Sequence, residues 1–98
     1  MDKQAKRDRL KAWRLAERAR ALAALPLEDD VLEAMFEALE VALEADACDH
    51  TRRKTEAWLQ SHDYTGARVA AWLDETGGFC DCAVLFNSMD AWIKATGR

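Results

Sequence analysis

The chain lacks any apolar run that approaches the length of a membrane span, so no membrane association is expected. The only apolar stretch after the basic amino-terminal residues, 21–27, is short and contains the sole proline, which argues against a secretory signal. Cysteine is scarce as well: three residues, an odd number, do not make a disulfide framework. We therefore expect a cytoplasmic protein, because thiols in a reducing compartment serve metals more readily than disulfides.

Several catalytic signatures are also missing. The chain has neither the His-Glu-x-x-His motif nor the deaminase pattern His-x-Glu with Pro-Cys-x-x-Cys, and it has no phosphate-binding or dinucleotide-binding glycine loop. His62 lies near a predicted helix end, which is typical of a capping or surface residue. Glu56 or Asp74 could act as a general base, but nothing in the spacing selects them. Whether the protein is an enzyme stays open, and these absences favour a non-enzymatic role.

What the chain does contain is a strong charge asymmetry within one 98-residue domain of net charge −4. Residues 1–20 carry eight Lys/Arg against three Asp/Glu, whereas residues 28–46 carry eight Asp/Glu and no Lys/Arg. The acidic balance argues against a general nucleic-acid binder, although the basic segment alone could bind nucleic acid. The alternative is that its cations form a solvated face that pairs with the acidic segment.

Apolar periodicity predicts a mostly α-helical fold. Two long helices are expected over residues 2–25 and 28–46, with Pro26 between them, and we predict that residues 1–46 form an antiparallel hairpin. Residues 47–98 are expected to form a metal-bound helical module. Its predicted elements are helices over 51–61 and 66–75, a Gly77-Gly78 stop, a short strand within 79–86 and a last helix over 88–95.

The four tryptophans divide into two groups. Trp58, Trp72 and Trp92 fall at inward positions of predicted helices, so we expect them in the core. Trp13 lies off the Ala/Leu face of the first helix, which suggests packing against a neighbour or a second subunit.

All three cysteines belong to two matched tripeptides, Cys48-Asp49-His50 and Cys80-Asp81-Cys82. Each places two potential ligands one residue apart at the boundary of a predicted element, where the backbone can turn both toward one ion. Three thiolates and one imidazole are the ligand set of a closed tetrahedral zinc site. Cys48, His50, Cys80 and Cys82 are therefore the predicted ligands, with zinc as the first metal and iron as the second. Asp49 and Asp81 are expected to cap turns or face water.

Other interpretations of the tripeptides remain. The cysteines could be small buried side chains with His50 at a helix start, or Cys80 and Cys82 could form a strained disulfide. A metal site with one non-ligand among the four would keep an open, catalytic position.

The segment from Cys48 to Asn87 resembles a family of small bacterial proteins, domain of unknown function 2695. The resemblance rests on Cys-Asp-His-Thr at 48–51, Trp-Leu at 72–73 and Gly-Gly-Phe-Cys-Asp-Cys-Ala-Val-Leu-Phe-Asn at 77–87. Ala83 departs from the acidic residue of the family pattern. The family has no established activity, so the resemblance supports the metal site and not a function.

These observations predict a small zinc-stabilised helical protein with a structural Cys3His site, acting as a macromolecular interaction module. A protein partner is expected first, nucleic acid through the basic helix second, and a homodimer is a further option. The alternative is a zinc-dependent hydrolytic enzyme with three protein ligands and an open position.

Overall fold

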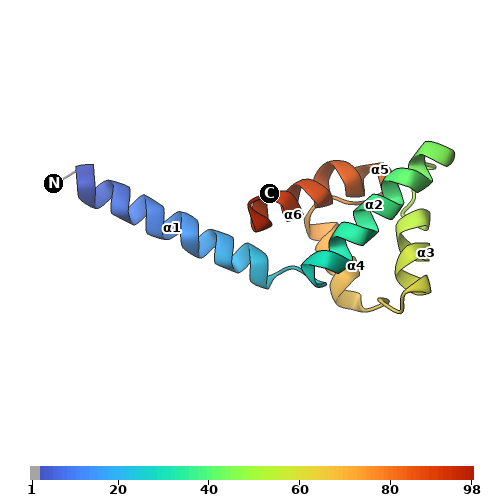
Figure 1. Cartoon of the computed structure of the whole chain (residues 1–98), viewed down its shortest axis with the longest axis horizontal. Helices are drawn as coiled ribbons and strands as arrows, with labels where there is room; N and C mark the ends of the chain where they lie inside the picture. The colour runs from blue at the N-terminus through green and yellow to red at the C-terminus, as the bar shows by residue number, and fades with distance from the viewer. Residues whose placement is uncertain (1–2) are drawn as a thin grey trace.

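The first helix projects from a bundle formed by the rest of the chain (Figure 1). The structure is a computed structural model that describes residues 3–98. Helix α1 (Lys3–Ala23) has no buried residue, and the molecule is 57 Å long but only 24 × 20 Å across. The helix predicted over 2–25 is confirmed, although its first residue lies outside the described part. In residues 3–98 no helix is both long and apolar enough to cross a bilayer.

The remaining elements are all helical in the region that the structure covers. They are α2 (Asp29–Ala45), α3 (Arg53–Ser61), α4 (Ala67–Glu75), α5 (Asp81–Ala83), the π-helical turn η1 (Val84–Ser88) and α6 (Met89–Thr96). The bounds of α2, α3, α4 and α6 lie within two residues of the predicted helices, whereas α5 and η1 were not predicted as helices.

The core lies between α2 and the carboxyl-terminal helices. Four side chains of α2 at helical spacing are buried, which gives the helix one apolar face. Trp72 and Trp92 lie in the core as predicted, whereas Trp58 is only partly buried and stacks on His62 with ring centroids 4.1 Å apart. The buried apolar residues are Leu32, Met35, Phe36, Leu39, Leu59, Val69, Trp72, Leu73, Val84, Trp92 and Ala95.

The expected antiparallel hairpin of residues 1–46 is not formed, because α1 runs outward and lies beside the end of α6 instead of folding back on α2 (Figure 1). The direction of α1 is set where it leaves the bundle. Arg68 of α4 donates hydrogen bonds to the carbonyl oxygens of Ala23 (3.1 Å) and Leu25 (3.0 Å). Leu25 and Leu27 pack against the core on either side of Pro26. The charges of α1 are therefore not placed on the acidic face of α2.

The strand predicted within residues 79–86 is wrong, since this segment begins a continuous helical stretch from α5 through η1 to α6. Val84, Ser88, Trp92 and Ala95 are all buried, and their spacing is that of one helix face. Phe86, which made the run look like a strand, is 78% exposed. Ser88, the first residue of the last predicted helix, lies inside the stretch with its hydroxyl 2.6 Å from that of Thr76.

The predicted glycine stop of α4 is confirmed. Gly77 has φ of 82°, and the N–H groups of Gly77 and Gly78 bond to the carbonyls of Asp74 (3.2 Å) and Leu73 (2.7 Å), a Schellman motif. Gly78 is also a point of close approach, because a Cβ there would collide with the Ser88 hydroxyl. The chain can therefore turn from α4 directly into the Cys80-Asp81-Cys82 segment.

Candidate functional site

The first tripeptide forms a tight turn after α2. The Asp49 carboxylate accepts hydrogen bonds from the backbone N–H (3.1 Å) and the hydroxyl (2.6 Å) of Thr51. Hydrogen bonds from Thr51 and from the side chain of Arg53 lower the pKa of Asp49 to about 2. Within this turn His50 takes φ of 69°, a left-handed conformation that is uncommon outside glycine. The His50 N–H thereby reaches the Cys48 sulfur, with 3.4 Å between nitrogen and sulfur.

The second tripeptide is anchored by its central aspartate. Asp81 is fully buried, and its carboxylate accepts the N–H of Lys54 (3.1 Å), the N–H of Thr55 (2.9 Å) and the Thr55 hydroxyl (2.8 Å). These N–H groups belong to the first turn of α3, so Asp81 caps a helix that begins 28 positions earlier in the chain. The Asp81 N–H bonds in turn to the carbonyl of Thr51 (2.9 Å). These contacts hold the two tripeptide segments side by side.

The three cysteine sulfurs come together between these segments. The Cys48 sulfur accepts the N–H groups of Cys82 and His50 and lies within hydrogen-bonding reach of the thiols of Cys80 and Cys82, and these donors lower the pKa of Cys48. The bond to Cys48 and partial burial raise the pKa of the Cys82 thiol. The cysteines are partly buried and free, so neither a buried apolar role nor a Cys80–Cys82 disulfide is found. Backbone donors directed at one sulfur are a setting that stabilises a thiolate.

The fourth predicted ligand is placed differently. His50 is exposed, and its contact with Cys48 is made by the backbone N–H. Among residues 3–98, no group of three or more His, Cys, Asp or Glu side chains is arranged so that it could hold a metal ion. The predicted ligands therefore lie on adjoining turns, but their donor atoms are not grouped as a coordination shell.

Cations at the start of α3 pair with carboxylates around the site. Their salt bridges join α3 to the end of α2, to the first tripeptide and to α4, and they engage the predicted general base Asp74. Glu56, the other suggested base, is exposed on α3. The pairs are Arg52 with Asp74 (2.8 Å), Arg53 with Asp49 (3.0 Å) and Asp46 (3.3 Å), and Lys54 with Asp46 (3.2 Å).

The sequence reasoning missed how differently the two aspartates are used. Both cap turns, as expected, but Asp81 is buried and bridges distant segments whereas Asp49 is exposed and acts locally. No local sequence pattern distinguishes the two aspartates, and the one signal that could have done so is Thr55, a hydroxyl residue that is buried on the inner face of α3. His62 has its Nδ1 2.9 Å from the carbonyl oxygen of Trp58, consistent with the expected capping role.

Comparisons with known proteins agree with the resemblance seen in the sequence. A family model described as "Protein of unknown function (DUF2695)" matches residues 35–87, which include both tripeptides. Uncharacterized protein Rv2271 of Mycobacterium tuberculosis (strain ATCC 25618 / H37Rv) and Uncharacterized protein Mb2294 of Mycobacterium bovis are each 36% identical over 86 residues, covering 88% of this chain and 87% of theirs. No solved structure matches the chain. The chain belongs to the DUF2695 family of proteins of unknown function.

Proposed function

We propose that this protein is a small zinc-stabilised helical protein with a structural Cys3His site, and that it acts as a macromolecular interaction module. The observation that carries the proposal is the convergence of three free sulfurs, Cys48, Cys80 and Cys82, with two backbone N–H groups directed at Cys48. Thiolates are ligands that zinc favours, and neighbouring N–H groups offset their negative charge. The same soft donors suit iron, which is the second candidate.

His50 is the fourth ligand in this proposal. It stands two residues from Cys48 in the same turn, and its side chain is exposed. In residues 3–98 its ring takes no part in a side-chain hydrogen bond, so reorienting it breaks no such contact. Rotation of this ring toward the sulfurs would complete a closed four-ligand set.

An ion at this position would stabilise the fold. It would join the end of α2 to the start of α5 and so close the loop of 29 residues that separates His50 from Cys80. Because α1 has no buried residue, the core of the protein comes from the rest of the chain alone. A domain with so small a core gains a large share of its stability from a structural metal.

The interaction role is supported by α1. Its 21 residues include Leu10, Trp13 and Leu15, which are 53%, 60% and 62% exposed. A projecting helix that exposes large apolar side chains is typical of a binding element. The role therefore belongs to α1, and the proposed metal site supports the bundle that carries it.

The position of His50 also favours a second candidate, a zinc-dependent hydrolytic enzyme. If the ring stays in solvent, three thiolates remain as protein ligands and the fourth position is open for water. Cobalt substitution separates the two candidates: a d–d spectrum that does not respond to anions or pH indicates a closed structural site, and a responsive spectrum indicates the open one.

The proposal is tested by elemental analysis of protein produced without added metal, followed by zinc titration of the chelator-treated protein. One zinc per chain is expected. Cys48→Ser and Cys82→Ser should lose the metal and melt at lower temperature, and His50→Ala should weaken binding. His62→Ala is the matched control, because it removes the other histidine and should keep the metal. A chain that takes up no zinc, or metal loss with an unchanged melting curve, contradicts a zinc-stabilised fold.

A further inference from the structure

Five of the eight cations of α1 form one stripe along the helix. Their intervals of 4, 4, 3 and 4 residues place all five within about 80° around the axis at 3.6 residues per turn. Across residues 3–98 none of the five forms a salt bridge with a carboxylate. The basic stripe consists of Lys3, Arg7, Lys11, Arg14 and Arg18.

Five of the six carboxylates of α2 form a second stripe with the same intervals of 4, 4, 3 and 4 residues. Arg98 pairs with two of them, Asp29 and Glu33. The other three make no salt bridge within the part of the chain that the structure describes. The acidic stripe consists of Asp29, Glu33, Glu37, Glu40 and Glu44.

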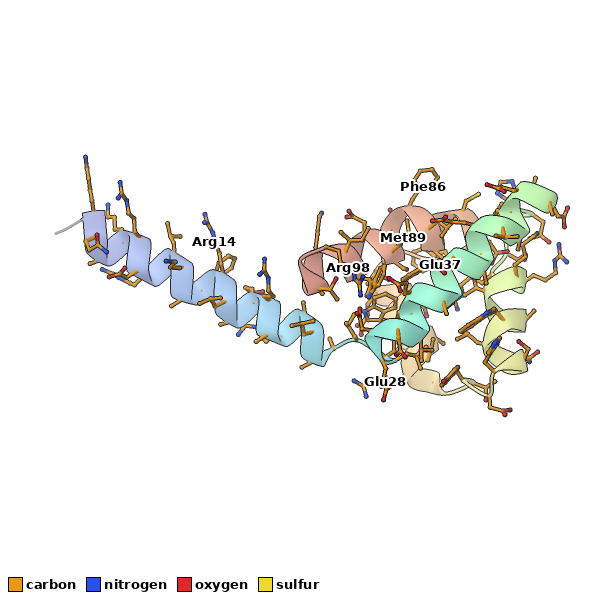
Figure 2. All side chains as sticks on the ribbon, viewed as in Figure 1. Arg14, Glu28, Glu37, Phe86, Met89 and Arg98 are labelled. Atoms are coloured by element: carbon orange, nitrogen blue, oxygen red, sulfur yellow. The ribbon has the colours of Figure 1, made fainter. Side chains whose placement is uncertain are left out.

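The two stripes match but do not meet within one chain. Figure 2 shows Arg14 on the projecting helix and Glu37 on the bundle, far from each other. Arg68 and the packing of Leu25 and Leu27 hold α1 in its outward direction, so its own α2 is out of reach. Each chain thus presents a basic stripe without a carboxylate partner in residues 3–98 and an acidic stripe of which only Asp29 and Glu33 are paired, both with Arg98.

We propose that α1 of one copy docks on the acidic stripe of α2 in a second copy, and that the reciprocal contact closes a two-fold dimer. The inference deepens the proposed interaction role by naming the partner, and it does not depend on zinc. In both contacts the basic stripe of one chain meets the acidic stripe of the other. The two contacts are therefore equivalent, as a two-fold interface requires. Opposite charge along both helices also sets the orientation and register of the encounter.

Exposed apolar residues lie beside each stripe and extend the contact. On α1, one side of the basic stripe is bordered by apolar residues that lie next to Lys11 around the helix. They are Leu15, Ala19 and Leu22. On α2, Val41, which is 66% exposed, flanks the acidic stripe on the corresponding side. In an antiparallel arrangement Leu15 and Leu22 would lie beside Val41, and in a parallel arrangement Leu10 and Trp13, on the other side of the basic stripe, would do so, so exposed apolar side chains of α1 meet Val41 in either direction. Individual exposed ion pairs are weak, and this apolar strip supplies the desolvated part of the contact.

The test uses charge reversal with analytical ultracentrifugation of the full chain at tens of micromolar. The wild-type protein should be dimeric at low salt and dissociate as salt is raised. Lys11→Glu/Arg14→Glu and Glu37→Lys/Glu40→Lys should each be monomeric alone, because each leaves like charges opposed. An equimolar mixture of the two should form a heterodimer, since the reversed, acidic α1 of the first variant faces the reversed, basic α2 of the second, and the unchanged α1 of the second faces the unchanged α2 of the first.

The matched control is Lys6→Glu/Arg9→Glu, which makes the same charge change on another face of α1 and should leave the dimer intact. Circular dichroism verifies that each variant keeps its helices. A monomeric wild-type chain at low salt overturns the proposal, as does a mixture that fails to associate. A monomeric wild-type chain whose α1 instead shifts an RNA or DNA oligonucleotide identifies nucleic acid as the partner and likewise overturns it. Zinc content is measured separately. Failure of the zinc-stabilised fold and failure of the dimer can therefore be told apart.

Discussion

Replacing Asp81 by alanine is expected to be the most damaging single change at the tripeptides. The side chain is fully buried and accepts three hydrogen bonds, two from the first turn of α3 and one from the Thr55 hydroxyl, which is itself fully buried. In alanine all three donors lose their acceptor. The first turn of α3 then has no side-chain cap, because Arg52 at its own N-cap position makes none.

The size of the effect follows from these contacts. Loss of a helix cap costs about 0.5–2 kcal/mol, and a buried hydroxyl left without an acceptor costs about 1–3 kcal/mol. Asp81→Ala should therefore lower the free energy of unfolding by about 2–5 kcal/mol, a large part of the roughly 5–15 kcal/mol available to a domain. Asp81→Asn keeps the oxygen that Thr55 uses but turns an amide group toward the Lys54 N–H, so we expect a loss of about 1–2 kcal/mol.

Urea denaturation followed by circular dichroism measures these losses, and chelator-treated protein removes any contribution of a metal. Asp49→Ala is the matched control: it truncates the central aspartate of the other tripeptide, which is exposed, and should cost much less. The reasoning is refuted if Asp81→Ala is no more destabilising than Asp49→Ala. Combining Asp81→Ala with Thr55→Val should cost less than the sum of the two single changes, because the valine no longer leaves a hydroxyl unpaired.

Further changes probe the contacts that shape the bundle. Gly78→Ala should lower the free energy of unfolding by about 1–3 kcal/mol in thermal melts, because its methyl group would overlap the Ser88 hydroxyl; Gly66→Ala, whose methyl group meets only open space or ordinary contacts, should be nearly neutral. Arg68→Met should release the two carbonyls at the end of α1, and faster proteolysis between α1 and α2 would show it, whereas an unchanged rate would contradict the assigned role. Trp92→Phe removes a 2.7 Å hydrogen bond to a carboxylate of α2 and should cost about 1.5–3 kcal/mol in urea titrations.

The helices could be predicted because their signals are local. The stripe of Leu32, Met35, Phe36 and Leu39 repeats at helical spacing, and Gly77 supplies the left-handed residue that ends α4. The direction of α1 could not be predicted in this way. This direction depends on Arg68, which lies more than 40 residues further along the chain. It also depends on the packing of Leu25 and Leu27 against a core that exists only in the folded bundle.

The false strand has a physical reason as well. Phe79 to Phe86 is short, apolar and rich in aromatic residues, and such runs do not distinguish a strand from a helix. Phe79 and Phe86 are 67% and 78% exposed, so the two residues that most favoured a strand take no part in the core. The helical spacing of Val84 and Trp92 decides the structure, and it becomes visible only when the run is extended into α6.

At the candidate site the sequence predicted which side chains come close but not how they are held. The paired spacing identified Cys48, Cys80 and Cys82, and the thiols of Cys80 and Cys82 lie within hydrogen-bonding reach of the Cys48 sulfur, although in residues 3–98 no three such side chains are arranged to hold a metal ion. The role of Asp81 could not be predicted, because its partners on α3 lie 26 and 27 positions away. The left-handed backbone of His50, with φ of 69°, could not be predicted from the sequence either.

The outward helix also determines how the protein moves through solution. The radius of gyration of the whole chain is 16.2 Å. In compact proteins the radius of gyration grows with chain length and reaches this value only at about 190 residues. A monomer of 98 residues should therefore elute from a gel-filtration column near the volume of a globular protein of about twice its mass. Elution volume alone would mistake one chain for two, and the buoyant mass from sedimentation equilibrium, which is independent of shape, distinguishes them.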